Sequence, residues 1–266
     1  MTHPFRAPEV DAPDVLICAG LDPSGGAGLI ADVRVVSALG CRPVGVVTAL
    51  TVQNTTGVVD SEAMNPERVR EQLEFLLSDV EVRAVKIGMI GSTAIGEGIG
   101  RALALTAAPV VWDPVVHPSR GDVRFVDGRF EDAARALAPH VTVLTPNAGE
   151  LAFMTGAQVA SLADARSVGQ ALAERLRAAV LVKGGHFGGE ESVDLLCEPG
   201  GIVELRGPRT AGGEHVHGTG CALSSALAAH LARGLALVDA CRAAKDFVAA
   251  RIAAPVRPGR GAVAVV

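Results

Sequence analysis

Aromatic residues are scarce in this chain of 266 residues: they make up 3% of it, with no Tyr and a single Trp, although hydrophobic residues together reach 49%. The core must therefore be built from Val, Leu, Ile and Ala, and a chain of this length can bury a sizeable one. Short aliphatic runs are typical of strands that are covered on both faces. The composition therefore favours a parallel sheet that lies between helices.

Cysteine pairs and long apolar runs are also absent from the sequence. The five cysteines are widely spaced without any Cys-x-x-Cys pair, which argues against a disulfide framework and against a zinc site. Residues 1–13 are polar and proline-rich and lack the apolar stretch of a signal peptide. No apolar run reaches roughly 18 residues, so we expect no transmembrane helix. We expect a flexible segment over residues 1–13 and one domain over residues 14–266, in the cytoplasm.

The chain also lacks any run of Lys and Arg, and its formal net charge is −5. This charge pattern argues against broad attraction to nucleic acid. An anionic ligand would have to be held by local features, such as helix N-termini and single basic residues.

Strand-like and helix-like runs alternate along most of the chain. Aliphatic runs predict strands at residues 15–19, 44–50, 84–87, 110–112, 141–144 and 179–182, and an edge hairpin at residues 192–205. Helices are predicted up to residue 39 after the Gly-rich turn 20–28, and at residues 66–80, 94–105, 130–137, 147–154, 162–177, 218–232 and 237–253. In the helix 66–80 we expect Val69, Leu73, Phe75 and Leu76 to form a buried apolar stripe.

This alternation implies right-handed βαβ units and a mostly parallel central sheet flanked by helices on both faces, in a three-layer α/β fold. Ligands of such sheets bind beyond the carboxyl ends of the strands. We therefore expect the functional site where the following residues gather, together with the turn before Cys221: Asp22, Gln53, Met89, Asp113, Asn147 and Lys183.

The segment His217-Gly218-Thr219-Gly220-Cys221 precedes a long apolar helix. Glycines at the start of a helix let backbone N–H groups approach an anion, and the helix dipole adds partial positive charge there. Such fixed donors stabilise a phosphoryl group in transfer. Cys221 would lie in the first turn, where the thiolate is favoured and can accept a proton from a substrate hydroxyl. The alternatives are a glycine-rich turn that buries a small Cys, and a Cys–His nucleophile pair, which no orienting partner supports.

The turn from Asp22 to Gly28 follows a strand and opens a helix. It lacks the Gly-Lys-Ser/Thr ending of a Walker A loop and the spacing of a dinucleotide fingerprint. Its glycines indicate a close approach of the backbone to a ligand. Asp32, about one helical turn further on, either faces the same pocket or is a solvated helix acid.

Three polar positions follow later strands. Asn147 and Glu150 form an Asn-x-x-Glu pattern at a strand-to-helix junction, where Asn147 caps the helix or Glu150 orients Mg²⁺ through water. Lys183 either neutralises a nucleotide phosphate or is an ordinary loop lysine. Asp113, at the end of an aliphatic strand, needs a partner, which is either a metal–phosphate cluster or a structural salt bridge.

Six segments in one order resemble the hydroxymethylpyrimidine/phosphomethylpyrimidine kinase family of thiamine biosynthesis, in the ribokinase-like superfamily. They are residues 20–28, 49–55, 86–89, 145–147 together with Glu150, 183–186, and 217–221. The resemblance covers nearly the whole chain. It implies two successive phosphorylations with ATP and Mg²⁺, which convert 4-amino-5-hydroxymethyl-2-methylpyrimidine into its monophosphate and then its diphosphate. It also implies a homodimer with an open, lidless site.

The resemblance implies a role for each matching residue. Cys221 would be the base, and Gly218, Thr219 and Gly220 would form the anion hole. The pyrimidine would contact Gly20, Asp32, Gln53, Met89 and Val115. The nucleotide would contact Asn147, Lys183 and His217, and Asp113 and Glu150 would hold Mg²⁺ through water.

Two segments depart from the family pattern. After Asp113 the family usually has Ala-Lys-Ser-Gly-Asp, whereas this chain has Ser119 in place of the lysine, followed by Arg120. Before His217 the family usually has Asn-Thr, whereas this chain has His215 and Val216. Both departures concern expected phosphate contacts.

Two other functions are compatible with the same motifs. One is a pyridoxal or pyridoxine kinase of the same superfamily. By resemblance, Gln53 and Met89 favour a pyrimidine substrate over a pyridoxal one. The other is a non-catalytic protein that binds the pyrimidine phosphate, against which the complete set of site residues speaks.

Overall fold

The computed structural model describes residues 11–116, 125–185 and 187–266. Within these residues, one sheet has the strand order β11-β10-β9-β8-β6-β4-β1-β2-β3, and β5 pairs with β7 in a small second sheet. The strands are β1 Asp14–Leu21, β2 Arg42–Asn54, β3 Gly57–Ala63, β4 Val82–Ile87, β5 Gly91–Ser92, β6 Val110–Trp112, β7 Val126–Asp127, β8 Val143–Leu144, β9 Ala179–Val182, β10 Glu191–Glu198 and β11 Gly201–Pro208.

The centre of the main sheet is parallel, from β2 through β1, β4, β6 and β8 to β9. Both edges are antiparallel: β10 and β11 form the predicted edge hairpin, and β3 pairs with β2 at the opposite edge. Strand β3 was not predicted, because its sequence is mostly polar and small and has only two adjacent valines, Val58 and Val59.

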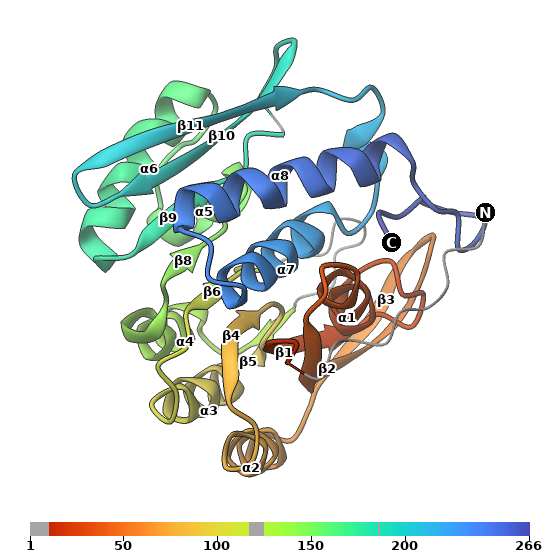
Figure 1. Cartoon of the computed structure of the whole chain (residues 1–266), viewed down its shortest axis with the longest axis vertical. Helices are drawn as coiled ribbons and strands as arrows, with labels where there is room; N and C mark the ends of the chain where they lie inside the picture. The colour runs from red at the N-terminus through yellow and green to blue at the C-terminus, as the bar shows by residue number, and fades with distance from the viewer. Residues whose placement is uncertain (1–10, 117–124, 186) are drawn as a thin grey trace.

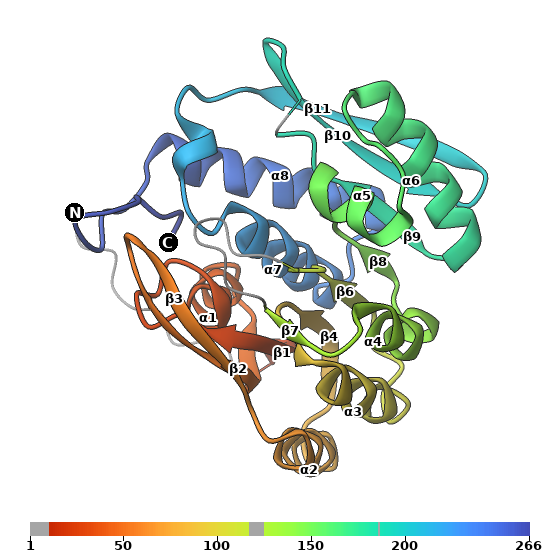
Figure 2. The same cartoon turned by 180° about the vertical axis from the view of Figure 1, so that it is seen from behind.

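Helices cover both faces of the sheet, which confirms the predicted three-layer α/β fold (Figures 1 and 2). One face carries α1 Gly28–Ala38, α7 Thr219–Ala232 and α8 Leu237–Ala253, whose apolar residues form one core cluster with the strands. The other face carries α2 Pro66–Leu77, α3 Thr93–Leu103, α4 Phe130–Leu137, α5 Ala148–Thr155 and α6 Leu162–Leu176. Short 3₁₀ turns lie at Ala138–His140 and Gly213–His215. Over the described ranges, no helix combines the length and the apolar character that crossing a bilayer requires.

The expected apolar stripe of α2 is wrong at one position. Val69 and Leu73 are buried, but Phe75 is 83% exposed. Residue 75 lies about 200° further round the helix than residue 73, so the two side chains leave the helix on opposite sides.

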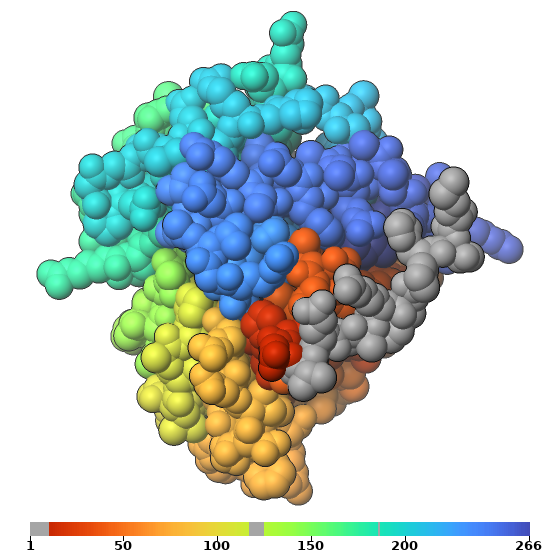
Figure 3. Space-filling model, in the orientation of Figure 1, coloured from red at the N-terminus to blue at the C-terminus, as the bar shows by residue number. Residues whose placement is uncertain are grey.

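Helix α7 is the central helix of its layer. Every residue from Ala222 to His230 is buried, which is expected of a helix that is apolar and small all round. It packs against α1 and α8 and crosses the strands β1, β4 and β6. In the space-filling view of this face, the blue atoms of α7 and α8 lie over the middle of the molecule (Figure 3). The first turn of α7 is therefore held at a fixed place above the sheet.

Candidate active site

The carboxyl ends of the parallel strands open into a cavity of about 610 Å³. The first turn of α7 reaches the same cavity, so the sheet edge and the helix N-terminus meet there. All of the predicted site residues except Asp32 line it: Gly20, Gln53, Met89, Asp113, Val115, Asn147, Glu150, Lys183, His217, Gly218, Thr219, Gly220 and Cys221. The segment with Ser119 and Arg120 and the residue His186 lie outside the described residues.

A glycine is required where the chain enters α7. Gly218 has φ 83°, a conformation that favours glycine. A Cβ atom there would stand 2.0 Å from the carbonyl oxygen of Gly26 in the turn before α1. Around this end of α7, the described part of the chain supplies no side-chain cap. The first N–H groups of the helix are therefore left for a ligand.

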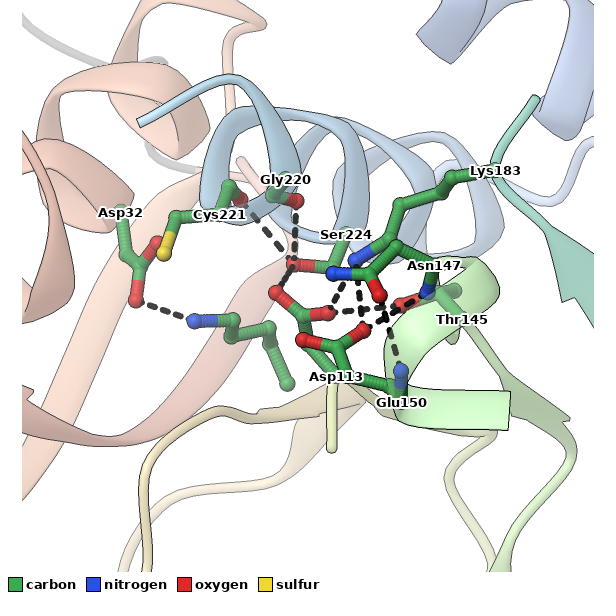
Figure 4. A network of polar contacts seen from close by, with 10 residues as sticks. Asp32, Asp113, Thr145, Asn147, Glu150, Lys183, Gly220, Cys221 and Ser224 are labelled. Carbon is green, nitrogen blue, oxygen red and sulfur yellow. Dashed lines mark hydrogen bonds and ion pairs between the residues drawn. The ribbon is translucent and has the colours of Figure 1, made fainter. Parts of the chain in front are cut away.

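Lys183 lies beside the first turn of α7. Its Nζ is 2.8 Å from Oδ1 of Asp113 and 3.4 Å from Oε2 of Glu150 (Figure 4). A Cβ atom on Gly220 would be only 3.2 Å from Lys183 Nζ, so the glycine leaves the space between helix and lysine open. Burial lowers the pKa of Lys183, but the two carboxylates outweigh burial and raise it above its ordinary value. The site therefore places a fixed positive charge beside a helix N-terminus.

Asp113 is held by two hydroxyl groups as well as by Lys183. Thr145 Oγ1 lies 3.2 Å from its Oδ1, and Ser224 Oγ lies 3.4 Å from its Oδ2. Ser224 also lies 3.1 Å and 3.0 Å from the carbonyl oxygens of Gly220 and Cys221. No role was predicted for either residue, although Thr145 belongs to the segment 145–147 at a strand end and Ser224 follows Gly220 by one helical turn. Ser224 joins the end of β6 to the first turns of α7, and Thr145 joins it to the end of β8.

Asn147 and Glu150 form a reciprocal capping box on α5. The Asn147 side chain accepts from the Glu150 N–H at 2.9 Å, and the Glu150 carboxylate accepts from the Asn147 N–H at 2.7 Å. The structure therefore contains the helix cap that was one of the two alternatives for this motif. The Glu150 carboxylate also faces Lys183, so capping is not its only contact. Burial raises the pKa of Glu150, and Lys183 opposes that rise.

The two carboxylates fit a cation that arrives with its own ligands. Within the described ranges, no group of three or more His, Cys, Asp or Glu side chains is arranged to hold a metal ion. Mg²⁺ commonly binds to one or two carboxylates and takes its remaining ligands from water and phosphate oxygens. Asp113 and Glu150 supply such a pair.

Cys221 lies in the first turn of α7, at the opposite end of the network from Lys183 (Figure 4). Burial raises the pKa of its thiol to about 11; Lys86 offsets part of this rise, whereas the charges of Asp32 and Asp113 add to it. The expectation that the helix N-terminus favours the thiolate is therefore wrong here, because the cost of burying a charge exceeds the gain from the helix dipole. Burial therefore favours the thiol form of Cys221 at neutral pH.

Asp32 lies behind the cavity and does not line it. Its carboxylate is fully buried, with Lys86 Nζ at 2.5 Å and Ser225 Oγ at 2.8 Å. Asp32 is therefore neither a residue that lines the pocket nor a solvated helix acid, the two alternatives that the sequence left open. Burial lowers the pKa of Lys86, but Asp32, Cys221 and Asp113 outweigh burial and raise it to about 12. Lys86, which has no predicted role, therefore brings a buried positive charge to Cys221.

One end of the cavity is an apolar slot. Met89 packs with Ala49, Val58 and Phe125, and Val115 adjoins them. A Cβ atom on Gly20 would stand 2.7 Å from Met89 Sδ, so a glycine is needed for the slot to keep its width.

His217 lies at this slot rather than beside Lys183. Its Nε2 is 3.4 Å from Nε2 of Gln53 and 3.3 Å from Oδ2 of Asp22. Burial raises the pKa of Asp22, but the hydrogen bonds from His217 and Ser24 outweigh burial and lower it. The structure therefore places His217 with the predicted acceptor contacts, not with the predicted nucleotide contacts.

The other end of the cavity is also walled by apolar side chains. Val216 is buried and lines it together with Leu223, Val248 and Ile252, whereas His215 is exposed. Val216, at a position where the family usually has a hydroxyl, thus extends an apolar wall.

Comparison with known proteins identifies the family of the chain. A family model described as phosphomethylpyrimidine kinase matches residues 22–266. The hydroxymethylpyrimidine/phosphomethylpyrimidine kinase of Streptomyces coelicolor is 40% identical over 261 residues, which cover 98% of this chain and 96% of that protein. The solved phosphomethylpyrimidine kinase of Clostridium difficile superposes with a TM-score of 0.75 at 32% identity, over 91% of this chain and 100% of that one. An ADP complex of Bacillus subtilis pyridoxal kinase superposes with a TM-score of 0.84 at 26% identity, over 96% and 97% of the two chains.

Proposed function

The chain belongs to the phosphomethylpyrimidine kinase family, and from this premise we propose that it makes the pyrimidine precursor of thiamine. It transfers a phosphoryl group from ATP to 4-amino-5-hydroxymethyl-2-methylpyrimidine, and a second one to the resulting monophosphate. The relatives named for both activities support this assignment.

The single observation that carries the proposal is the position of the α7 N-terminus between two ends of one cavity. The apolar slot with Gln53 suits a flat, methylated ring that also bears hydrogen-bonding groups. The wall formed by Val216, Leu223 and Val248 suits a nucleotide base. The first turn of α7 and Lys183 lie between them, where a phosphoryl group would pass from one ligand to the other.

In the first transfer, the thiolate form of Cys221 accepts the proton of the hydroxymethyl group as the alcohol oxygen forms a bond to the γ-phosphorus of ATP. The bond between that phosphorus and the oxygen bridging to the β-phosphate breaks, and ADP leaves with the electron pair. Fixed N–H donors of Gly218, Thr219 and Gly220 stabilise the charge on the transferred group. Lys86 stabilises the thiolate that accepts this proton, because its ammonium is buried and held by Asp32.

Lys183 binds the nucleotide phosphates, and Asp113 and Glu150 are the residues that would hold Mg²⁺ through water. The metal ion would neutralise phosphate charge when it is bound with ATP. The hydroxyl groups of Thr145 and Ser224 keep the Asp113 carboxylate oriented toward this place.

A second candidate is phosphorylation of pyridoxal. It is supported by the higher TM-score with the pyridoxal kinase of Bacillus subtilis, 0.84 against 0.75, although the sequence identity is lower. The slot would have to accept a pyridine ring in place of a pyrimidine ring.

The test is to incubate purified protein with Mg-ATP and one acceptor at a time: the pyrimidine alcohol, its monophosphate or pyridoxal. ADP and the phosphorylated products are followed together. We expect turnover of both pyrimidines. Turnover of the alcohol alone would limit the enzyme to one step, preferred turnover of pyridoxal would support the second candidate, and binding of the pyrimidine monophosphate without turnover would contradict catalysis.

A further inference from the structure

The residues after α8 return to the active site. Figures 1 and 2 both show the end of the chain beside β3, and in Figure 3 deep blue atoms of this segment lie against orange atoms of the β2–β3 hairpin. Residues 259–265, here called the strap, run between two turns that line the cavity. The strap contacts one turn through Thr55 and the other through His217.

The first contact is with the turn between β2 and β3. The N–H of Gly261 donates to Oγ1 of Thr55 at 3.0 Å, and the N–H of Ala262 donates to the carbonyl oxygen of Thr55 at 2.8 Å. Thr55 follows Gln53 by two residues, so the strap holds the turn that carries the predicted pyrimidine contact.

The second contact is with the residue that precedes the anion hole. The N–H of His217 donates to the carbonyl oxygen of Val263 at 2.8 Å, and the N–H of Val265 donates to the carbonyl oxygen of His217 at 3.2 Å. The strap is itself closed by a pair of 2.8 Å bonds between Val256 and Ala264. Both backbone groups of His217 are thus fixed by the strap.

The strap fits the hairpin turn without spare room. A Cβ atom on Gly261 would stand 2.0 Å from the carbonyl oxygen of Thr55, and one on Gly259 would stand 2.5 Å from Thr55 Oγ1. Ala262, between them and His217, lines the cavity. The direct side-chain contact between the two turns, from Gln53 to His217, is 3.4 Å and long for a hydrogen bond. The backbone bonds of the strap are therefore the shorter connection.

We propose that the strap is a positioning element that fixes the acceptor-binding turn at a set distance from the anion hole. This inference rests on the proposed kinase function. An alcohol oxygen reacts only when it is held close to the phosphorus and in line with it, and a misplacement of about 1 Å can cost about a hundredfold in rate. Thr55 and Gly261 are positioning residues in this sense, since they act through Gln53 and His217.

The first test is Gly261→Ala, with Gly201→Ala as the matched control. Gly201 begins β11, and a Cβ atom there meets nothing within 4 Å. We expect Gly261→Ala to lower kcat/KM for the pyrimidine alcohol by about ten- to hundredfold. The dissociation constant of Mg-ADP, measured by calorimetry, should remain close to that of the unaltered chain.

A second pair of variants keeps the test decisive where the added methyl group prevents folding. Thr55→Val removes the oxygen that accepts from Gly261, and Thr55→Ser restores it. We expect Val to reduce kcat/KM for the alcohol and Ser to recover most of it, again with unchanged Mg-ADP binding. Normal turnover in Thr55→Val, equal losses in Val and Ser, or a parallel loss of Mg-ADP affinity would overturn the proposal. Turnover by the unaltered chain reports separately on the proposed function.

Discussion

Replacing Cys221 by alanine should separate the two phosphorylations. The alcohol must lose a proton to attack phosphorus, whereas the monophosphate does not, because the second pKa of a phosphate monoester is about 6. Burial raises the pKa of the Cys221 thiol to about 11. At pH 7.5 only roughly one thiol in 3,000 is then ionised in the free enzyme. Under the proposed mechanism, the first transfer depends on that ionisation and the second does not.

The expected magnitudes follow from this difference. A positioned base contributes about a hundred- to ten-thousandfold, so Cys221→Ala should lower kcat with the alcohol by about that factor. With the monophosphate the loss should stay below about tenfold, since the N–H groups of the anion hole and Lys183 are retained. In the unaltered enzyme, kcat/KM for the alcohol should rise about tenfold per pH unit above pH 7, while that for the monophosphate should be nearly flat.

The assay measures ADP release with each acceptor supplied separately, and the products are separated by chromatography. Cys241→Ala is the control for loss of a buried thiol, because Cys241 is buried in α8, away from the cavity. Equal losses with the two acceptors would show that Cys221 supports nucleotide binding or folding instead of proton transfer. A flat pH profile for the alcohol would refute the reasoning as well.

Three further predictions concern charged groups around the cavity. Lys86→Met leaves Asp32 buried without its cation and should destabilise the fold by about 3–5 kcal/mol. Urea unfolding, followed by the fluorescence of Trp112, the single tryptophan, measures the loss of stability. An unchanged urea midpoint would contradict the pairing of Lys86 with Asp32. Glu150→Gln should raise the Mg²⁺ concentration for half-maximal rate several-fold with little change in the KM of the acceptor, and an unchanged Mg²⁺ requirement would remove Glu150 from the metal site. The folded-state pKa of Asp22 is lowered from 3.8, so the contribution of its carboxylate to stability is present above about pH 4 and is lost as the pH falls through the folded-state pKa. Asp22→Asn should therefore lower Tm at pH 7 more than at pH 3. Equal losses of Tm at both pH values would contradict this.

Much of the fold followed from local patterns. The boundaries 110–112, 130–137, 179–182 and 237–253 agree with the elements observed, because an aliphatic strand or an amphipathic helix is recorded in consecutive residues. The hairpin strand β3 was missed because pairing with β2, not its own composition, makes it a strand.

The site was predictable where chemistry follows a strand end and was not where it depends on distant partners. The alternation of strands and helices placed Asp113 and Lys183 at one edge of the sheet. By contrast, Asp32 meets Lys86 across 54 positions of sequence, and only the folded chain brings them together. The local rule for Cys221 failed because a helix N-terminus contributes about 0.3–1 kcal/mol at a surface, and burial of a thiolate costs more.

The burial of α7 from Ala222 to His230 bears on where the acceptor specificity of this scaffold can change. A substitution anywhere from Ala222 to His230 has to be accommodated by the sheet, α1 and α8 at once. We therefore expect few single substitutions to be tolerated in the helix that follows the proposed anion hole. The walls of the acceptor slot, such as Met89 and Val115, belong to loops and strand ends that can vary singly. We therefore expect a change of acceptor to require substitutions at the slot rather than in α7. Solved structures of a phosphomethylpyrimidine kinase and of a pyridoxal kinase share the architecture of this chain.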